Sequence, residues 1–334
     1  MTALLAVENL STRFRLKRGG SEIRALHRVS FTVAAGQTLG VVGESGSGKS
    51  TLARSILRLV EAREGRVLFD GEDLLALDAA RLRQRRRDLQ MIFQDPFASL
   101  DPRFSVRRLL EEPLMVHGLG DRAARQRRVA ELLQQVGLDP GAAEHYPHEF
   151  SGGQRQRVGI ARAIALNPRV IVADEPVSAL DVSIQAQILN LLMDLRDRLQ
   201  LTYLFISHDL AVVRAIADRV AVMYLGEIVE WAPAEALYRQ PRHPYSEALL
   251  SAVPDPARRG RRIVLQGELP SPDRPPAGCP FHTRCPKVMA HCANEPPPEV
   301  ELGTAEAPHR VRCHLYGDRV PGSVQASQPL YSRA

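Results

Sequence analysis

The sequence predicts an α/β protein with a parallel β-sheet at its centre. Two apolar runs of strand length, Val170–Ala173 and Tyr203–Ile206, bracket a helix whose apolar residues recur with the 3.6-residue helical period. A strand, a helix and a strand in this order indicate parallel pairing. A third apolar strand, Thr38–Val42, runs directly into a glycine-rich loop, and Ser50–Val60 follows as a helix. These observations place a ligand-binding loop at the carboxyl edge of the sheet.

The composition narrows the class of protein. The chain has 334 residues, of which 44% are hydrophobic and 25% charged, which suits one large globular domain with an appendage. It has no apolar run long enough for a membrane helix, and its first residues lack the basic start and apolar stretch of a signal peptide. We therefore expect a chain that is neither secreted nor membrane-spanning by itself. The net charge of +6 suits a nucleic acid, an anionic membrane or a phosphate ligand equally well.

Two further regions surround the predicted parallel strands. Residues 1–40 alternate apolar and polar positions between glycine-containing breaks, which predicts short antiparallel strands. From about 73 to 165 the pattern is mostly helical and strongly basic, so we expect a helical insertion. The arginines between 81 and 87 could grip nucleic acid, but no aromatic residues are interleaved with them for stacking on bases. A charge run on a helix is usually a solvated face, and we favour that interpretation.

Proline marks a boundary near residue 254. Prolines are frequent from there to residue 298 and leave little room for helices, and all four cysteines lie beyond residue 278. We expect a main domain over residues 1–253 with a helical subdomain at about 95–165. A small cysteine-containing, metal-binding region is predicted at 254–318, and a flexible tail at 319–334.

The glycine-rich loop matches the pattern G-x-x-x-x-G-K-S/T between a strand and a helix, the context that a phosphate-binding loop requires. Its glycines let successive backbone N–H groups turn toward phosphates, and the helix N-terminus adds positive potential. Lys49 is expected to reach the β- and γ-phosphates of ATP, and Ser50 to ligate Mg²⁺. The predicted ATP-binding residues of this loop are Gly43, Glu44, Ser45, Gly46, Ser47, Gly48, Lys49, Ser50 and Thr51.

Two carboxylates follow the strand Val170–Ala173. A parallel sheet brings this strand end beside the phosphate-binding loop. Asp174 is predicted to hold the Mg²⁺ shell through water, and Glu175 to orient and deprotonate the attacking water. Two acids at such a point could also merely cap the next segment. Their combination with the phosphate-binding loop favours the catalytic interpretation.

A short motif indicates the family. Ser151-Gly-Gly-Gln154 precedes a helix-compatible run, and small residues at a helix N-terminus make a second anion site. Followed by Arg-Gln-Arg, the motif resembles the signature of the ATP-binding-cassette (ABC) ATPases. The resemblance implies a RecA-like P-loop ATPase core with an antiparallel β subdomain and a helical signature subdomain. It also implies a head-to-tail dimer in which the signature of one subunit completes the nucleotide site of the other. The predicted signature residues are Ser151, Gly152, Gly153 and Gln154.

The remaining motifs of that family are present in its order. By resemblance, Gln94 is the Q-loop residue that touches Mg²⁺ and relays the nucleotide state, and Ser178 and Asp181 belong to the D-loop. His208 is similar to the switch histidine that contacts the γ-phosphate, and Phe14 lies where an aromatic residue stacks on adenine. The predicted catalytic residues are Glu175, His208 and Lys49. The predicted Mg²⁺ ligands are Ser50, Gln94 and Asp174.

Longer stretches narrow the resemblance to the oligopeptide/dipeptide importer ATPases, and among these to the F-type subunit. The stretches are Gln94–Arg103, His148–Gln154, Asp174–Gln187 and His243–Tyr245. The resemblance implies an ATPase at the cytoplasmic face of the inner membrane that powers uptake of di- or oligopeptides. Its implied partners are a D-type ATPase as heterodimer, two transmembrane permeases and an extracytoplasmic substrate-binding protein, with no nucleic acid. In this family the helical insertion docks on the permeases.

Two alternatives stay open at this point. The first is a soluble ABC ATPase that acts on nucleic acid or ribosomes, and the second is an importer of nickel chelates or glutathione. The single phosphate-binding loop and the lack of a sustained heptad repeat argue against the first. Nothing in the sequence identifies the cargo.

The cysteines lack the tight C-x₂-C spacing of common zinc sites. Thiolates still suit a soft metal. A similar pattern in peptide-importer ATPases looks like the ligand set of a 4Fe–4S cluster, which takes four cysteines. Zinc with histidine ligands and unligated structural thiols are the alternatives. The predicted cluster ligands are Cys279, Cys285, Cys292 and Cys313, and the histidines that could replace them are His282, His291 and His314.

Overall fold

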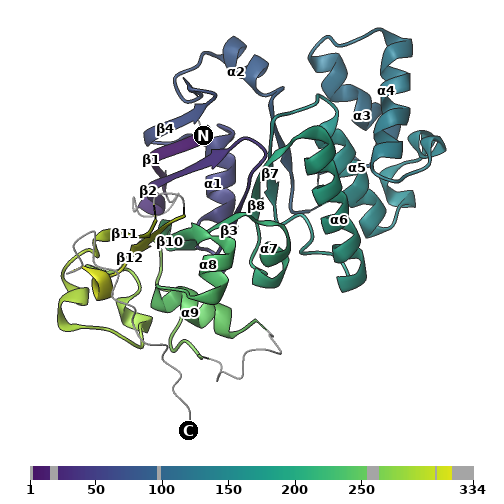
Figure 1. Ribbon diagram of the computed structural model, residues 1–334. Helices are drawn as coiled ribbons and strands as arrows, with labels where there is room; N and C mark the ends of the chain where they lie inside the picture. The colour runs from purple at the N-terminus through teal and green to yellow at the C-terminus, as the bar shows by residue number, and fades with distance from the viewer. Residues whose placement is uncertain (1–2, 16–21, 96–98, 254–262, 305–306, 318–334) are drawn as a thin grey trace.

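The computed structural model describes residues 3–15, 22–95, 99–253, 263–304 and 307–317. These residues form two β-sheets with helices around them (Figure 1). The larger sheet has the strand order β11-β12-β10-β9-β3-β8-β7-β6. Its strands are β3 (Thr38–Val42), β6 (Leu89–Ile92), β7 (Val170–Asp174), β8 (Thr202–Ile206), β9 (Arg219–Tyr224), β10 (Glu227–Pro233), β11 (Glu299–Gly303) and β12 (Pro308–Arg312).

The parallel part of this sheet is as predicted. β6, β7, β8, β3 and β9 pair in parallel in that spatial order. Because side chains alternate across a strand, each buried strand feeds two cores. On β7, Val170 and Val172 pack on the face that carries α1 (Lys49–Ile56), whereas Ile171 and Ala173 pack on the opposite face with the other helices. Burial on both faces explains why these strands read as continuous apolar runs.

The smaller sheet is antiparallel and covers α1. Its strands are β1 (Ala3–Arg15), β2 (Glu22–Ala34), β4 (Glu64–Phe69) and β5 (Glu72–Asp73). Leu52 and Ile56 of α1 share one buried cluster with residues of β1 and of the central sheet, so the helix lies between the two sheets. The sequence predicted short strands here. β1 and β2 are instead 13 residues each, because bulges at their register shifts let the long pair bend without breaking.

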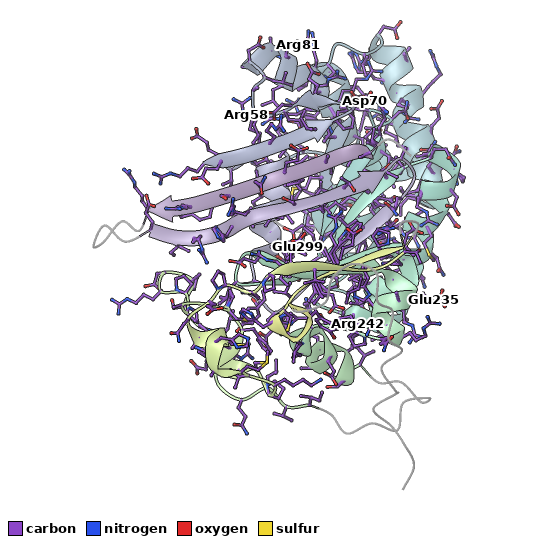
Figure 2. All side chains as sticks on the ribbon, turned by 60° about the vertical axis from the view of Figure 1, so that its left-hand side comes forward. Arg58, Asp70, Arg81, Glu235, Arg242 and Glu299 are labelled. Carbon is purple, nitrogen blue, oxygen red and sulfur yellow. The ribbon has the colours of Figure 1, made fainter. Side chains whose placement is uncertain are left out.

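The helical insertion packs beside the central sheet rather than on it (Figure 1). It contains α3 (Val106–Val116), α4 (Arg122–Gln135) and α5 (Gly152–Ile164), with two 3₁₀ turns before α5. The arginine-rich α2 (Ala79–Arg85) lies at the end of the antiparallel sheet where Figure 2 labels Arg81 and Asp70, and its Arg83 donates to the carbonyl oxygen of Val116 at the end of α3. Arg81 and Arg85 both pair with Glu72, at 2.7 and 2.5 Å. These arginines therefore lie on a charged surface with acidic partners from the same chain.

The remaining helices close the other face of the sheet. They are α6 (Val182–Leu199), α7 (Leu210–Ile216), α8 (Ala234–Arg239) and α9 (Pro244–Ser251). In the part of the chain that the structure describes, no helix is long and apolar enough to cross a membrane.

The cysteine-bearing region is joined to the central sheet. β12 pairs antiparallel with β10 and with β11, so the last strands extend the sheet of the nucleotide-binding core. A buried pair strengthens this junction, since His309 lies 2.6 Å from Glu230, and both side chains are less than a tenth exposed. Between the strands and α9 the region has only 3₁₀ turns in its described residues, which agrees with its proline content. The predicted tail at 319–334 lies outside the described residues.

The fully buried His243 makes stability depend on pH. Burial lowers the pKa of its imidazole from 6.5 to about 4, and nearby Glu230 only partly opposes this. As the pH falls, His243 therefore takes up a proton in the unfolded chain before it does so in the folded one. The contribution of this residue to the free energy of unfolding is fully present above pH 6.5 and is lost as the pH falls toward 4. Its upper limit is about 3 kcal/mol. We expect His243→Asn to reduce the loss of unfolding free energy between about pH 7 and pH 5 in urea titrations. Exposed His148→Asn should keep the wild-type loss, and an unchanged loss in His243→Asn would contradict the assignment.

Candidate nucleotide-binding and hydrolysis site

The glycine-rich loop is held tightly against the end of the sheet. Gly43 and Gly48 have φ angles of 156° and 103°, and a Cβ at either position would come within 2.6 Å of a backbone carbonyl oxygen. Only glycine fits there. The Lys49 side chain turns back into the loop, where its Nζ donates to the carbonyl oxygens of Gly43 (2.8 Å) and Glu44 (2.9 Å). Burial lowers the pKa of this ammonium, and the carboxylates of Glu175, Asp174 and Glu44 oppose the shift.

Asp174 and Ser50 meet beneath the loop. The Ser50 hydroxyl donates to Asp174 Oδ1 at 3.0 Å, which links the first turn of α1 to the end of β7. Asp174 is 1% exposed, and burial raises its pKa, although the Ser50 hydrogen bond opposes this. A buried carboxylate beside a hydroxyl is a set of hard oxygen donors, which suits Mg²⁺.

A second cluster centres on one oxygen of Glu175. Gln94 Nε2 donates to Glu175 Oε2 at 3.1 Å, and His208 Nδ1 lies 3.1 Å from the same oxygen. Glu175 has a left-handed φ of 48° directly after β7, and its N–H donates to Ile206 O of the neighbouring strand. A non-glycine residue seldom adopts this backbone conformation, and such positions often mark functional sites. The structure thus brings together residues that follow the ends of β6, β7 and β8 and are far apart in sequence.

The signature residues lie at the start of α5, where Ser151 and Gln154 are exposed and Gly152 and Gly153 are half-buried. Ser151 is the N-cap, because its hydroxyl accepts from Gln154 N at 3.3 Å while its own N–H donates to Gln154 Oε1 at 2.9 Å. This reciprocal capping box leaves the N-terminal N–H groups of Gly152 and Gly153 at an open helix end. Packing also requires glycine at position 153, because a Cβ there would lie 2.6 Å from the Ile184 side chain.

The predicted D-loop lies between β7 and α6. The Ser178 hydroxyl donates to the carbonyl oxygen of Glu175 at 3.1 Å. This hydrogen bond helps to fix the backbone that positions the Glu175 carboxylate. Asp181 is the N-cap of α6, and the next residue, Val182, is 82% exposed.

The predicted adenine contact stands apart from these clusters. Phe14 lies on β1 opposite Ile23 of β2 and is 40% exposed. The described contacts do not join it to the phosphate-binding loop.

Two residues that hold Glu44 were missed as site residues. Glu44 N donates to the hydroxyl of Tyr245 at 2.9 Å. Its carboxylate accepts two hydrogen bonds from Arg284, at 2.6 and 3.0 Å. Tyr245 belonged to a recognised stretch without an assigned role, whereas Arg284 had no local signal, because the contact spans 240 residues of sequence.

The four cysteines all lie in the C-terminal region, and each of the other three contributes to the pKa of Cys279. Cys279 and Cys313 are buried, and burial raises the pKa of each thiol to about 11, with a further contribution from the neighbouring cysteines. All four are free thiols. A tighter group also exists, in which ligand atoms of His291, Cys292 and His314 lie within 4.8 Å of one another. Among the described residues, the group whose ligand atoms lie this close together is therefore a mixed cysteine–histidine set.

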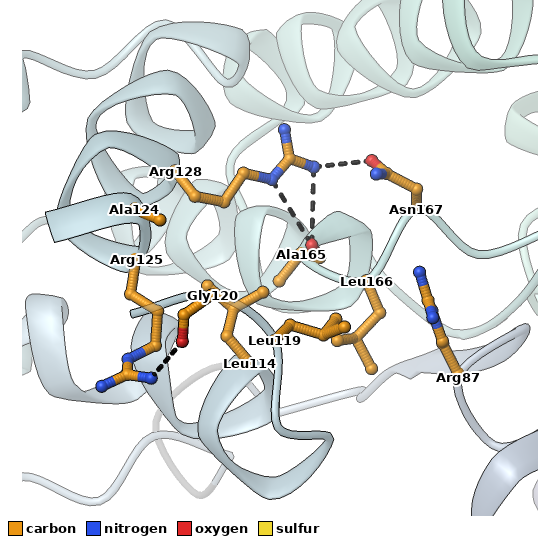
Figure 3. Close-up of a pocket in the computed structure, with 10 residues that line it drawn as sticks. All are labelled: Arg87, Leu114, Leu119, Gly120, Ala124, Arg125, Arg128, Ala165, Leu166 and Asn167. Atoms are coloured by element: carbon orange, nitrogen blue, oxygen red, sulfur yellow. Dashed lines mark hydrogen bonds between the residues drawn. The ribbon is translucent and has the colours of Figure 1, made fainter. Parts of the chain in front are cut away.

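A separate hollow lies on the helical insertion (Figure 3). Its volume is about 210 Å³, and Leu114 and Leu119 form part of an apolar floor with arginines around it. Arg128 is fixed there by Asn167 Oδ1 at 2.6 Å. At the adjoining end of α3, Met115 and Val116 are 56% and 47% exposed. This surface combines apolar side chains with positive charge.

Comparison with known proteins agrees with this geometry. A model of the family described as ABC transporter matches residues 26–178. Another, described as the oligopeptide/dipeptide transporter C-terminal region, matches residues 229–292. A post-hydrolysis dimer of the ATP-binding cassette MJ0796, bound to ADP and Pi, has a TM-score of 0.63 and 33% identity, and it covers 69% of this chain and 98% of that one. The fold is that of the ABC ATPases.

Full-length relatives give the family. The oligopeptide transport ATP-binding protein AppF of Bacillus subtilis (strain 168) is 53% identical over 305 residues, 90% of this chain and 92% of that protein. A probable peptide ABC transporter ATP-binding protein of Sinorhizobium fredii is 51% identical over 334 residues, 98% of this chain and 93% of that protein. The chain therefore belongs to the ABC transporter ATP-binding proteins of the oligopeptide/dipeptide family.

Proposed function

We propose that this chain is the F-type ATP-hydrolysing subunit of an importer that takes up di- or oligopeptides across the cytoplasmic membrane. The observation that carries the proposal is the convergence of Gln94 and His208 on Glu175 Oε2, beside the Asp174–Ser50 pair. A subunit that only bound nucleotide would not need an oriented carboxylate with two polar partners. The peptide cargo follows from the names of the relatives and from the C-terminal region.

The chemistry follows from these positions. Glu175 accepts a proton from water, the water oxygen forms a bond to the γ-phosphorus, and the bond to the β-phosphate oxygen breaks to leave ADP and phosphate. His208 contacts the γ-phosphate, and Lys49 exchanges its loop carbonyl partners for phosphate oxygens. Mg²⁺, held by Ser50, Gln94 and Asp174, would neutralise charge on the phosphates. Phe14 stacks on the adenine.

The site is completed by a second subunit. The open N-terminus of α5 suits the γ-phosphate of a nucleotide bound to the partner, and exposed Val182 beside Asp181 suits the dimer contact. Family membership implies an ABC dimer and membrane permeases. The proposed second ATPase is the D-type subunit in a head-to-tail heterodimer, together with two permeases and an extracytoplasmic substrate-binding protein. The chain would lie at the cytoplasmic face of the inner membrane.

The proposed organisation of the chain follows its motifs. Residues 1–253 form the ABC ATPase domain, with the helical subdomain at about 95–165, and residues 254–318 form the metal-binding region. Peptide uptake tests the function directly. In a strain that lacks this subunit and requires a peptide as its amino-acid source, the wild-type chain should restore growth and Glu175→Gln should not. Restored growth with Glu175→Gln at equal expression would contradict the proposal.

The cysteine group is proposed to hold a 4Fe–4S cluster. The presence of four free cysteines in one region supports the proposal, because such a cluster takes four thiolates. Anaerobic purification with iron, sulfide and zinc analysis provides the test. About four irons and four sulfides per chain are expected, with broad absorbance near 400 nm. One zinc and no iron would instead favour the group of His291, Cys292 and His314.

The end of α3 is proposed to contact a permease. Met115 is more than half exposed beside the apolar hollow, and a carboxylate placed there would be buried without a partner in the complex. We expect Met115→Glu to lower co-purification with co-expressed permeases about tenfold, with nucleotide binding retained. Val264→Glu, at a 74% exposed position of the C-terminal region, is the matched control. Undiminished co-purification of Met115→Glu would remove α3 from the contact.

A further inference from the structure

The phosphate-binding loop is held from outside by the cysteine-bearing region. Glu44 is the first residue after Gly43 in the loop, and Arg284 grips both of its carboxylate oxygens. A bidentate arginine–carboxylate pair is among the stronger and more directional polar contacts in proteins. The Arg284 side chain is only 7% exposed, and the Glu44 hydrogen bonds raise its pKa, so water competes little for the pair.

The surroundings of Arg284 make its position rigid. Its guanidinium lies over the ring of Tyr224, and Phe281 packs against Tyr224 and Tyr245 at ring distances of 5.2 and 5.4 Å. Tyr245 in turn accepts the Glu44 N–H. The backbone and the carboxylate of Glu44 are therefore held by one aromatic platform that joins β9, α9 and the cysteine-bearing region.

Two cysteines bracket Arg284 in sequence. It ends the 3₁₀ turn His282–Arg284, with Cys279 before the turn and Cys285 immediately after it. The turn is closed by hydrogen bonds from His282 N to Cys279 O and from Cys285 N to His282 O. Such a short turn has little stability of its own. The position of the guanidinium therefore depends on the packing of the cysteine-bearing region around this turn.

The contact between Arg284 and Glu44 fixes the part of the loop whose backbone binds the Lys49 side chain. Lys49 Nζ donates to the carbonyl oxygens of Gly43 and Glu44, so the peptide group after Gly43 places the ammonium that reaches phosphate. A loop already fixed in its binding conformation loses less conformational entropy when ATP binds. Leu269 adds a further contact, since it lies against Gly46 at the top of the loop.

We propose that Arg284 is a positioning residue for the phosphate-binding loop, which it holds through the carboxylate of Glu44. This inference rests on the proposed function, because it assumes ATP binding at Gly43–Thr51. It gives the cysteine-bearing region a role in nucleotide affinity: loss of the Arg284 guanidinium weakens ATP binding without changing a residue of the loop.

A double-mutant cycle tests the positioning role. Binding of a fluorescent ATP analogue with Mg²⁺ is measured for the full chain as wild type, Arg284→Gln, Glu44→Gln and the double variant. Each single variant is expected to bind about tenfold more weakly, and the double variant no more weakly than either. Lys287→Gln, which removes the same charge from the exposed pair with Glu247, should bind like wild type. Wild-type affinity in Arg284→Gln, or additive losses in the cycle, would overturn the proposal.

Metal content separates positioning from loss of the cysteine group. Arg284→Gln should retain wild-type iron or zinc. If it does not, Glu44→Gln carries the test, because Glu44 lies outside the cysteine-bearing region. The fold of each variant is checked by circular dichroism. A wild-type chain that binds no nucleotide would instead contradict the proposed function.

Discussion

Glu175→Gln is expected to lower ATP turnover by about 10²–10³-fold while Mg-ATP binding stays close to wild type. The amide has the shape of the carboxylate and can still meet Gln94 and His208, but it cannot take a proton from water. Initial rates of phosphate release and the affinity for a nonhydrolysable ATP analogue together give the result. The variant should bind nucleotide but hydrolyse it only very slowly.

The control for this variant is Glu299→Gln, which removes an exposed carboxylate on β11 at a position marked in Figure 2. It should turn over ATP at the wild-type rate. An ATP turnover rate of Glu175→Gln within threefold of the wild-type rate would exclude Glu175 as the base. His208 would then be the next candidate.

Lys49→Ala is expected to weaken ATP binding about 100-fold. The side chain is 5% exposed, so its removal leaves a buried cavity where phosphate charge would meet no cation. The two carbonyl oxygens that Lys49 now satisfies would also lose their donor. Isothermal titration with Mg-ATP measures the change.

Lys287→Ala removes an exposed lysine and should leave the affinity unchanged. Comparable affinities in Lys49→Ala and Lys287→Ala would mean that the loop backbone alone holds the phosphates. The wild-type titration should also be repeated without Mg²⁺, where weaker binding is expected because Ser50 and Asp174 then have no ion to share with the phosphates.

The parallel strands and the phosphate loop were predictable because their signals are local. Thr38–Val42 coincides with β3, and β7 and β8 each differ from their predicted ranges by one residue. An apolar run buried on both faces needs no knowledge of its neighbours to be recognised. The loop pattern carries its own chemistry, since glycine, lysine and serine are each required by the phosphate and its metal.

The predicted ends of helices and strands that were wrong depend on contacts with residues distant in sequence. The helix expected over Ser50–Val60 ends at Ile56, where Arg58 takes a left-handed φ of 52° and its side chain reaches the carbonyl oxygen of Leu74. The long strands β1 and β2 were read as shorter ones because their bulges interrupt the alternation.

The sequence by itself determined the residue types of the site: a lysine and serine in a phosphate loop, paired acids after a strand, a glutamine, a histidine and a glycine-rich helix start. Tertiary structure decided which of them share an atom, because only the strand order brings Gln94 and His208 to the same oxygen of Glu175. It also decided that Arg284 belongs with Glu44. Motif spacing describes neighbours along the chain, whereas an ion pair depends on distance in space, and the folded sheet and the aromatic platform set that distance.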